Sequence, residues 1–152
     1  MLTSLKKFLE HQQWAYSKGI DENIILFGMS GENGNFQCVA AVNDKAKKFI
    51  FVSIIGVRVP KDKVAVLLEA INKINYHLTF GNFEMDTLDS GEIRFKTSLL
   101  YQGIDEIQEA HISNTIVPNL ICADNYIPVF NELILENKTV DEVLKFLDQQ
   151  SN

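Results

Sequence analysis

Apolar residues occupy both alternating sets of positions in three short segments of the N-terminal half. These segments cover residues 23–30, 36–42 and 48–56, and polar turns separate them at Asn33-Gly34 and Asn43-Asp44-Lys45. Turns this short leave no room for a helical crossover, and Asn-Gly is typical of a type I′ hairpin turn. The pattern therefore predicts an antiparallel meander of three strands with apolar side chains on both faces.

Helical spacing of apolar residues precedes and follows this meander. Residues 2–12 carry leucine at positions 2, 5 and 9, and residues 61–78 follow Pro60. The second helix has one apolar stripe, formed by Val64, Leu67, Leu68, Ile71, Ile74 and Leu78. Val66 and Ala70 lie beside that stripe, so a second subunit could pack on them.

Two asparagines stand near the end of this second helix. At 100° per residue, Asn75 lies within the apolar stripe and Asn72 lies at its edge. A buried amide needs hydrogen-bond partners, so we expect Asn75 to be largely buried and bonded to main chain outside its own helix. A ligand-binding role for Asn75 is the less favoured alternative, because a lone amide supplies little chemistry.

Apolar and polar residues alternate along residues 82–99, which predicts a hairpin with one solvent-exposed face. Gly81 ends the helical region, and Gly91 is expected in the left-handed conformation of the turn at Asp89-Ser90-Gly91. This register pairs Asp86 with Arg94, and Glu84 with Lys96, as cross-strand pairs of opposite charge. The side chains expected to face inward are Phe83, Met85, Ile93, Phe95 and Leu99.

The C-terminal third has a helical pattern interrupted by proline. Residues 104–117 form a helix that Pro118 should end, and a further segment runs from Pro128 to about residue 135. Thr139 and Glu142 have the spacing of a capping box, which opens a last helix with Val140, Val143, Leu144 and Leu147 on its apolar stripe. The order α-β-β-β-α-β-β-α(α) predicts one α+β domain over residues 1–152, with helices on a five-stranded antiparallel sheet.

Composition and charge disfavour several classes of binding partner. The net charge of −6 disfavours binding to nucleic acid or to an anionic membrane surface. The N-terminal segment has no signal-peptide pattern, and no apolar run reaches the roughly 20 residues of a membrane span, so we expect a cytoplasmic protein. Cys38 and Cys122 lack metal-binding spacing and are expected to be buried free thiols.

Sequence signatures of catalysis are missing. The three histidines fall on separate predicted helices, and the chain contains no HExxH, GxSxG or phosphate-loop motif. We therefore expect no catalytic, metal-binding or cofactor-binding site, although a catalytic site assembled from distant residues remains an alternative.

The segment INKINYHLTFGNFEMD, followed by a turn and GEIRF, resembles the YbjN family of bacterial sensory-transduction regulators. The resemblance also includes Val59-Pro60 before the helix, Ala123-Asp124 and Pro128. The residues that carry the motif are Asn72, Asn75, Gly81, Phe83 and Gly91. The resemblance implies the fold of type III secretion chaperones and a non-enzymatic, homodimeric protein that binds other proteins.

A face of the meander is the expected partner surface. Ile24, Leu26 and Phe51 on the strands, together with Val66 and Ala70 on the helix, are the candidate dimer or partner residues. Segments 127–135 and 140–147 could instead cover that face internally, and this alternative stays open. The runner-up functions are a small-molecule-sensing domain and, third, an enzyme with an unrecognised site.

Overall fold

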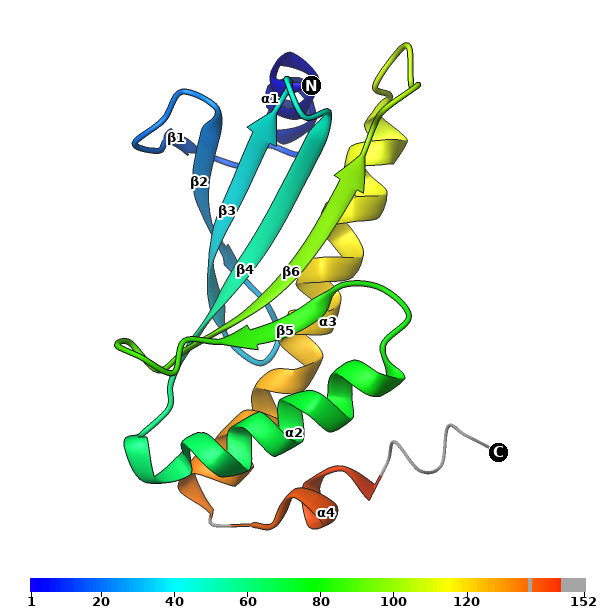
Figure 1. Ribbon diagram of the computed structural model, residues 1–152. Coiled ribbons are helices and arrows are strands. Elements are labelled where there is room, and N and C mark those ends of the chain that lie inside the picture. The colour runs from blue at the N-terminus through cyan, green and yellow to red at the C-terminus, as the bar shows by residue number, and fades with distance from the viewer. Residues whose placement is uncertain (137, 146–152) are drawn as a thin grey trace.

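The computed structural model describes residues 1–136 and 138–145 and shows an α+β fold built on one antiparallel sheet (Figure 1). The sheet has six strands in the order β1-β2-β3-β4-β6-β5. The strands are β1 Ser17–Lys18, β2 Ile24–Ser30, β3 Asn35–Asn43, β4 Lys48–Arg58, β5 Asn82–Met85 and β6 Glu92–Leu100. The described helices are α1 Leu2–His11, the 3₁₀ turn η1 Lys61–Lys63, α2 Val64–His77, α3 Glu109–Leu135 and α4 Val140–Val143.

The sixth strand, β1, was not predicted. It has only two residues, which is too short to show any periodicity in the sequence. Pairing of Ser17 with Leu26 and of Lys18 with Ile25 places it on the outer edge of β2. A hydrogen bond of 2.8 Å from the Gly19 N–H to the Ile24 carbonyl continues this pairing.

Helices cover one face of the sheet and one of its ends. Helix α3 packs against β4 and β6, α1 contacts α3, and α2 lies beyond β5 beside α4 (Figure 1). The core between the sheet and α3 is rich in fully buried aromatic side chains, each of which stabilises the fold by about 1.5–3 kcal/mol. These are Phe49, Phe51, Phe83, Phe95 and Phe130.

Helix α3 does not end at Pro118, contrary to the prediction. It runs for 27 residues and contains both Pro118 and Pro128. An internal proline costs a helix about 3 kcal/mol. The buried stripe continues on both sides of Pro118, through Ile116 and Ile127, and the burial of several such side chains outweighs that cost.

The hairpin of β5 and β6 has a register two residues away from the predicted one. Glu84 pairs with Arg94 and Asn82 with Lys96. Asp86 instead organises the loop: its carboxylate accepts hydrogen bonds from the Leu88 N–H at 3.0 Å and the Ser90 N–H at 2.9 Å. A shift of two residues preserves the face of every side chain, so the predicted inward set is correct. The predicted pair of Asp86 with Arg94 is wrong, whereas the predicted ion pair of Glu84 with Lys96 forms diagonally across the two strands.

The turn between β2 and β3 is not of type I′, because neither Asn33 nor Gly34 has a positive φ. A carboxylate from α3 holds this turn. Asp124 accepts hydrogen bonds from the Glu32 N–H at 2.9 Å and the Asn33 N–H at 3.0 Å. Gly31 must be small here, since a Cβ on it would lie 2.2 Å from the Asp124 Oδ1 atom.

The capping box of the last helix is confirmed. The Thr139 Oγ1 atom accepts from the Glu142 N–H at 3.3 Å, and the Glu142 carboxylate accepts from the Thr139 N–H at 2.8 Å. Helix α4 is short, and the predicted stripe residue Leu147 lies outside the described residues.

Candidate functional site

The strands β2, β3 and β4 place apolar side chains on the face opposite α3. Strand register aligns Leu26 with Val39 and Val52 in one row, and Ile24 with Ala41 and Ile50 in the next. Each of these side chains is half-buried or exposed, and Leu26 retains 37% of its surface. We call this surface the outer sheet face, and it comprises Ile24, Leu26, Val39, Ala41, Ile50, Val52 and Ile54.

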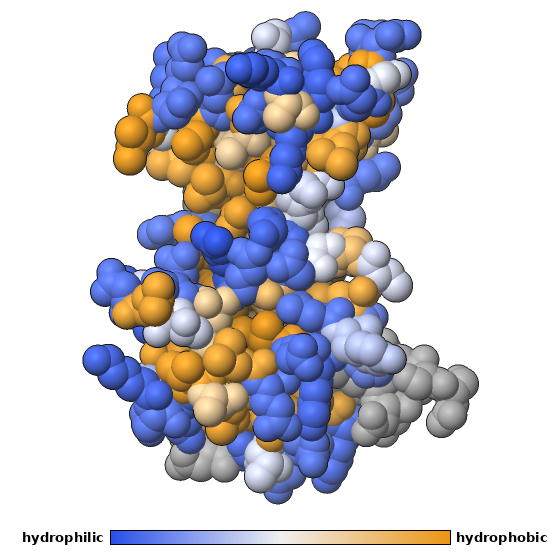
Figure 2. All heavy atoms as spheres, viewed as in Figure 1, coloured by the Kyte–Doolittle hydropathy of each residue, from blue (hydrophilic) through white to orange (hydrophobic). Residues whose placement is uncertain are grey.

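No described helix lies over the outer sheet face. Helix α3 packs on the opposite face, and α4 lies at the α2 end of the sheet, so the segments that could have covered the face lie elsewhere (Figure 1). Figure 2 shows apolar surface over the upper part of β2–β4, with a hydrophilic band below it. A contiguous apolar patch bordered by polar residues is typical of a protein–protein interaction site.

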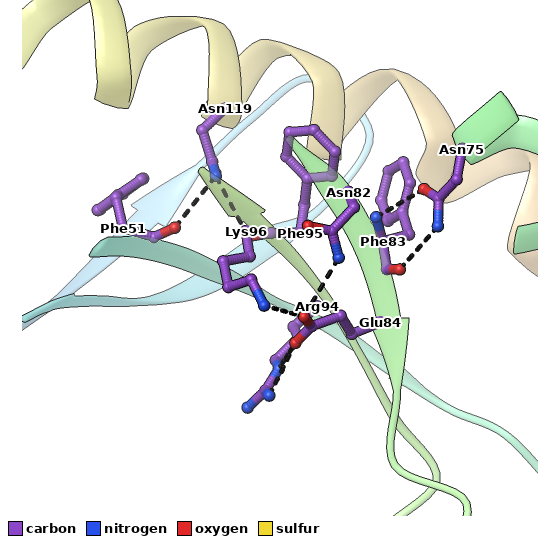
Figure 3. A network of polar contacts seen from close by, with 9 residues as sticks. All are labelled: Phe51, Asn75, Asn82, Phe83, Glu84, Arg94, Phe95, Lys96 and Asn119. Atoms are coloured by element: carbon purple, nitrogen blue, oxygen red, sulfur yellow. Dashed lines mark hydrogen bonds and ion pairs between the residues drawn. The ribbon is translucent and has the colours of Figure 1, made fainter. Parts of the chain in front are cut away.

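Charged side chains of β5 and β6 border this apolar surface. The Glu84 carboxylate accepts from the Arg94 guanidinium at 2.8 Å and also bonds the Lys96 ammonium (Figure 3). Lys96 continues the row of Val52, and Arg94 continues the row of Ile54. The border therefore brings two cations and one anion against the apolar rows.

The electrostatics of Glu84 keep this border ionised. Burial raises the pKa of the Glu84 carboxyl, but hydrogen bonds from Lys96, Asn82 and Arg94 lower it by more. The net pKa lies below the ordinary value for glutamate, so Glu84 is a carboxylate at neutral pH.

Phe51 is not part of the outer sheet face, contrary to our expectation. It is 0% exposed and pairs with Ala40 and Thr97, whose side chains are also buried. Alternation along β4 gives the outer positions to Ile50 and Val52 instead. Of the three predicted strand residues, the structure therefore brings together Ile24 and Leu26 only.

The predicted partner surface on α2 is also different in the structure. Ala70 is 0% exposed and Val66 is half-buried, whereas Leu68, expected in the core, is 44% exposed. Ala70 lies one turn from Lys73, whose ammonium bonds the Asp141 carboxylate of α4 at 2.7 Å. The chain's own C-terminal helix thus lies on the side of α2 where a second subunit was expected.

The motif residues contribute hydrogen bonds and turns to the fold. The Asn75 Oδ1 atom accepts from the Phe83 N–H at 2.8 Å, and its Nδ2 donates to the Phe83 carbonyl at 3.0 Å (Figure 3). Bonding to main chain outside the helix is confirmed, but Asn75 is half-buried rather than largely buried, and Asn72 is exposed. Gly81 and Gly91 both have positive φ, of 65° and 62°, which glycine adopts without strain.

Sequence reasoning missed Asn119, the most connected polar residue of the core. It is 0% exposed and accepts from the Ser53 hydroxyl at 2.6 Å. Its amide donates to the Thr97 hydroxyl at 3.0 Å. The amide also donates to the Phe95 carbonyl at 3.2 Å (Figure 3). Asn119 therefore links α3 to β4 and β6. The signal was an asparagine at helical spacing from Ile112 and Ile116, hidden by the assumption that Pro118 ends the helix.

The two free thiols of the described residues lie in the core. Burial raises the pKa of both Cys38 and Cys122 to about 12, so both thiols stay protonated. No cluster of three or more histidine, cysteine or acidic side chains that could hold a metal occurs in the described part of the chain. Within that same part, no helix combines the length and apolar character needed to cross a membrane.

The surface hollows that could hold a small molecule include two at opposite parts of the sheet. One, of about 610 Å³, is open to solvent between β5 and α3 and is lined in part by Phe80, Lys96 and Asn114. A second, of about 510 Å³, lies at the end of β2–β4 beside Asp21 and Lys48. Both hollows are partly open to solvent, unlike a pocket that encloses most of a bound ligand.

Residues 2–117 match the YbjN family, described as "Putative bacterial sensory transduction regulator". The chain belongs to the YbjN family. The match includes the outer sheet face, α2 and the hairpin, and it ends just before Pro118 of α3. No curated protein matches the chain.

Solved structures share the fold at low sequence identity. A crystal structure of "YbjN, a putative transcription regulator from E. coli" is 13% identical with a TM-score of 0.65, covering 84% of this chain and 88% of that one. A chain of the ExsC–ExsE complex is 12% identical with a TM-score of 0.57, over 84% and 94%. A chain of the HopA1–SchA chaperone–effector complex is 12% identical with a TM-score of 0.53, over 83% and 91%. The fold is therefore that of YbjN and of type III secretion chaperones, as the resemblance implied.

Proposed function

We propose that this protein is a non-enzymatic regulator or chaperone-like module that binds a protein partner on its outer sheet face. The observation that carries the proposal is the apolar surface of β2–β4, which no described helix covers. Membership of a family described as regulators supports it. So does the likeness to chains found in the ExsC–ExsE and HopA1–SchA complexes.

A matched pair of substitutions tests the surface. Leu26→Asp places a charge on the outer sheet face, where Leu26 is 37% exposed, and Leu88→Asp places one in the β5–β6 loop, where Leu88 is 96% exposed. Affinity capture from the native cytoplasm with mass spectrometry identifies partners, whose affinity for each purified variant is then measured. We expect Leu26→Asp to abolish binding and Leu88→Asp to preserve it.

Two results would reject the proposal. One is a folded Leu26→Asp variant that binds the captured partner as tightly as the wild type. The other is saturable binding of a small molecule in the hollow beside Lys96 and Asn114, with no protein partner, which favours the small-molecule-sensing function.

We propose further that the protein is cytoplasmic and forms a homodimer. The exposed side chain of Leu68, one turn from Val64 on α2, offers an apolar contact to a second subunit. Light scattering over a concentration series tests this, with Leu68→Lys as the variant that should shift the mass toward 17.2 kDa. A wild-type mass of 17.2 kDa at every concentration rejects the dimer.

A further inference from the structure

The short helix α4 packs against both α2 and α3, and we call the surface that it covers the α2–α3 groove. Its apolar side chains Val140, Val143 and Leu144 follow the i, i+3, i+4 spacing and are only 5–8% exposed. Helix α4 contacts both α2 and α3, and in Figure 1 it runs below α2, near the C-terminal end of α3. The groove therefore accommodates an amphipathic helical turn by its apolar face.

An ion pair joins α4 to α2 beside this apolar contact. The Asp141 carboxylate, in the first turn of α4, bonds the Lys73 ammonium of α2 at 2.7 Å. Lys73 also contacts Glu69 at 3.0 Å, which holds the ammonium on this side of α2. In this arrangement an acidic residue in the first turn of the occupant meets Lys73, and apolar residues occupy the adjoining face.

The attachment of α4 is of a kind that a competitor can replace. Helix α4 has four residues, and a helix of that length does not form alone in water. The Lys73–Asp141 ion pair is exposed to solvent, with 86% of the Asp141 side chain accessible, and such pairs stabilise weakly.

We propose that the α2–α3 groove is a second interaction site, which takes a short amphipathic helix from a partner protein and which α4 fills in the free chain. The partner helix has the pattern of α4: an acidic residue in its first turn that meets Lys73, and apolar residues spaced i, i+3, i+4. Helix α4 is then an intramolecular competitor that lowers the affinity of the groove. This site is separate from the outer sheet face and does not depend on the function proposed for that face.

A peptide of residues 136–152, labelled with fluorescein, is the probe. In the full-length Val143→Asp variant, a charge on the buried face of α4 releases the groove, so the labelled peptide should bind at least about tenfold more tightly than to the wild type. A peptide that itself carries Val143→Asp should not bind. Full-length Leu26→Asp, altered only on the outer sheet face, should bind the wild-type peptide as weakly as the wild-type protein does.

A charge reversal at Asp141 provides a second test of the proposal. Full-length Asp141→Lys places two ammonium groups together at Lys73 and should also open the groove to the wild-type peptide. If circular dichroism shows that Val143→Asp does not fold, the peptide affinity of Asp141→Lys tests the proposal in its place. Folded variants that bind the peptide no better than the wild type overturn the proposal. Binding that is insensitive to Val143→Asp in the peptide overturns it as well.

Discussion

Asn75 both donates to and accepts from Phe83, so one side-chain amide satisfies the two outward main-chain groups of that residue. Phe83 lies on β5, the last strand at this side of the sheet. Unpaired main-chain groups on an edge strand invite pairing with another chain. The amide occupies the place of a neighbouring strand, which explains why an asparagine stands on the apolar side of α2.

Replacing Asn75 with leucine should lower the free energy of unfolding by about 1–3 kcal/mol, because both Phe83 groups lose their partner. The urea midpoint of Asn75→Leu measures this change. Asn72→Leu is the control, since Asn72 is exposed on the same helix. Equal midpoints for the two variants would contradict the role assigned to Asn75.

A larger loss is expected at Asn119. Asn119→Leu leaves the Ser53 and Thr97 hydroxyls and the Phe95 carbonyl without this partner in the core, so the free energy of unfolding should fall by about 2–4 kcal/mol. Asn114→Leu, at an exposed position of the same helix, should change it by less than about 0.5 kcal/mol. Thermal and urea denaturation compare the two, and a small effect at Asn119 would show that the network is dispensable.

What the sequence could predict depended on whether the deciding contacts are local. The inward set of the hairpin follows from the period of two along each strand and survives a register shift of two residues. The register itself depends on the Asp86 loop. The hydrogen bonds of this loop cannot be predicted from the pattern of hydrophobic residues in the sequence. The prediction of a type I′ turn at Asn33-Gly34 was wrong because Asp124, about 90 residues away in the chain, sets the geometry of this turn.

The partner surface could be predicted in part for the same reason. Both faces of the meander are apolar, so the pattern alone could not assign Phe51 to the inner face or Val52 to the outer one. The burial of Ala70 was not predicted, and α4, which is distant in sequence, bonds α2 one turn away at Lys73. The local signals that were predicted correctly, the glycines at 81 and 91 and the capping box at Thr139, need only their immediate neighbours.

The observed register of β5 and β6 predicts which charges couple. A double-mutant cycle of Glu84→Gln with Arg94→Gln should give a coupling energy of about 0.2–1 kcal/mol at low salt. The same cycle between Asp86 and Arg94 should give none, because Asp86 bonds its own loop. If Arg94 coupled to Asp86 and not to Glu84, the result would support the register predicted from the sequence over the observed one.

The Asp86 loop should make stability depend on pH in the acidic range. Hydrogen bonds from the main chain of Ser90 and Leu88, and then from the Ser90 hydroxyl, hold the pKa of Asp86 well below its ordinary value. A folded-state pKa below the unfolded value means that the contribution is present above about pH 4 and is lost as the pH falls further.

The urea midpoints of the wild type and Asp86→Asn should therefore differ at pH 6 and converge toward pH 3. Asp89→Asn is the control, since Asp89 contributes only its main-chain N–H, at 3.4 Å, to the Asp86 carboxylate. A constant difference between the wild type and Asp86→Asn from pH 6 to pH 3 would rule out this linkage.

The pairing of β4 with β6 at the centre of the sheet has a consequence for how the chain acquires its structure. Strands β2 to β4 are complete once Arg58 has been synthesised, but their central neighbour β6 ends at Leu100. At 5–20 residues per second, roughly 2–8 s pass on the ribosome before β6 can dock, and α3 follows later still. During this interval both apolar faces of the nascent meander and its β4 edge are open. The apolar face proposed as the partner surface is thus exposed before the chain has folded. A sheet that pairs distant segments should refold in milliseconds to seconds rather than microseconds.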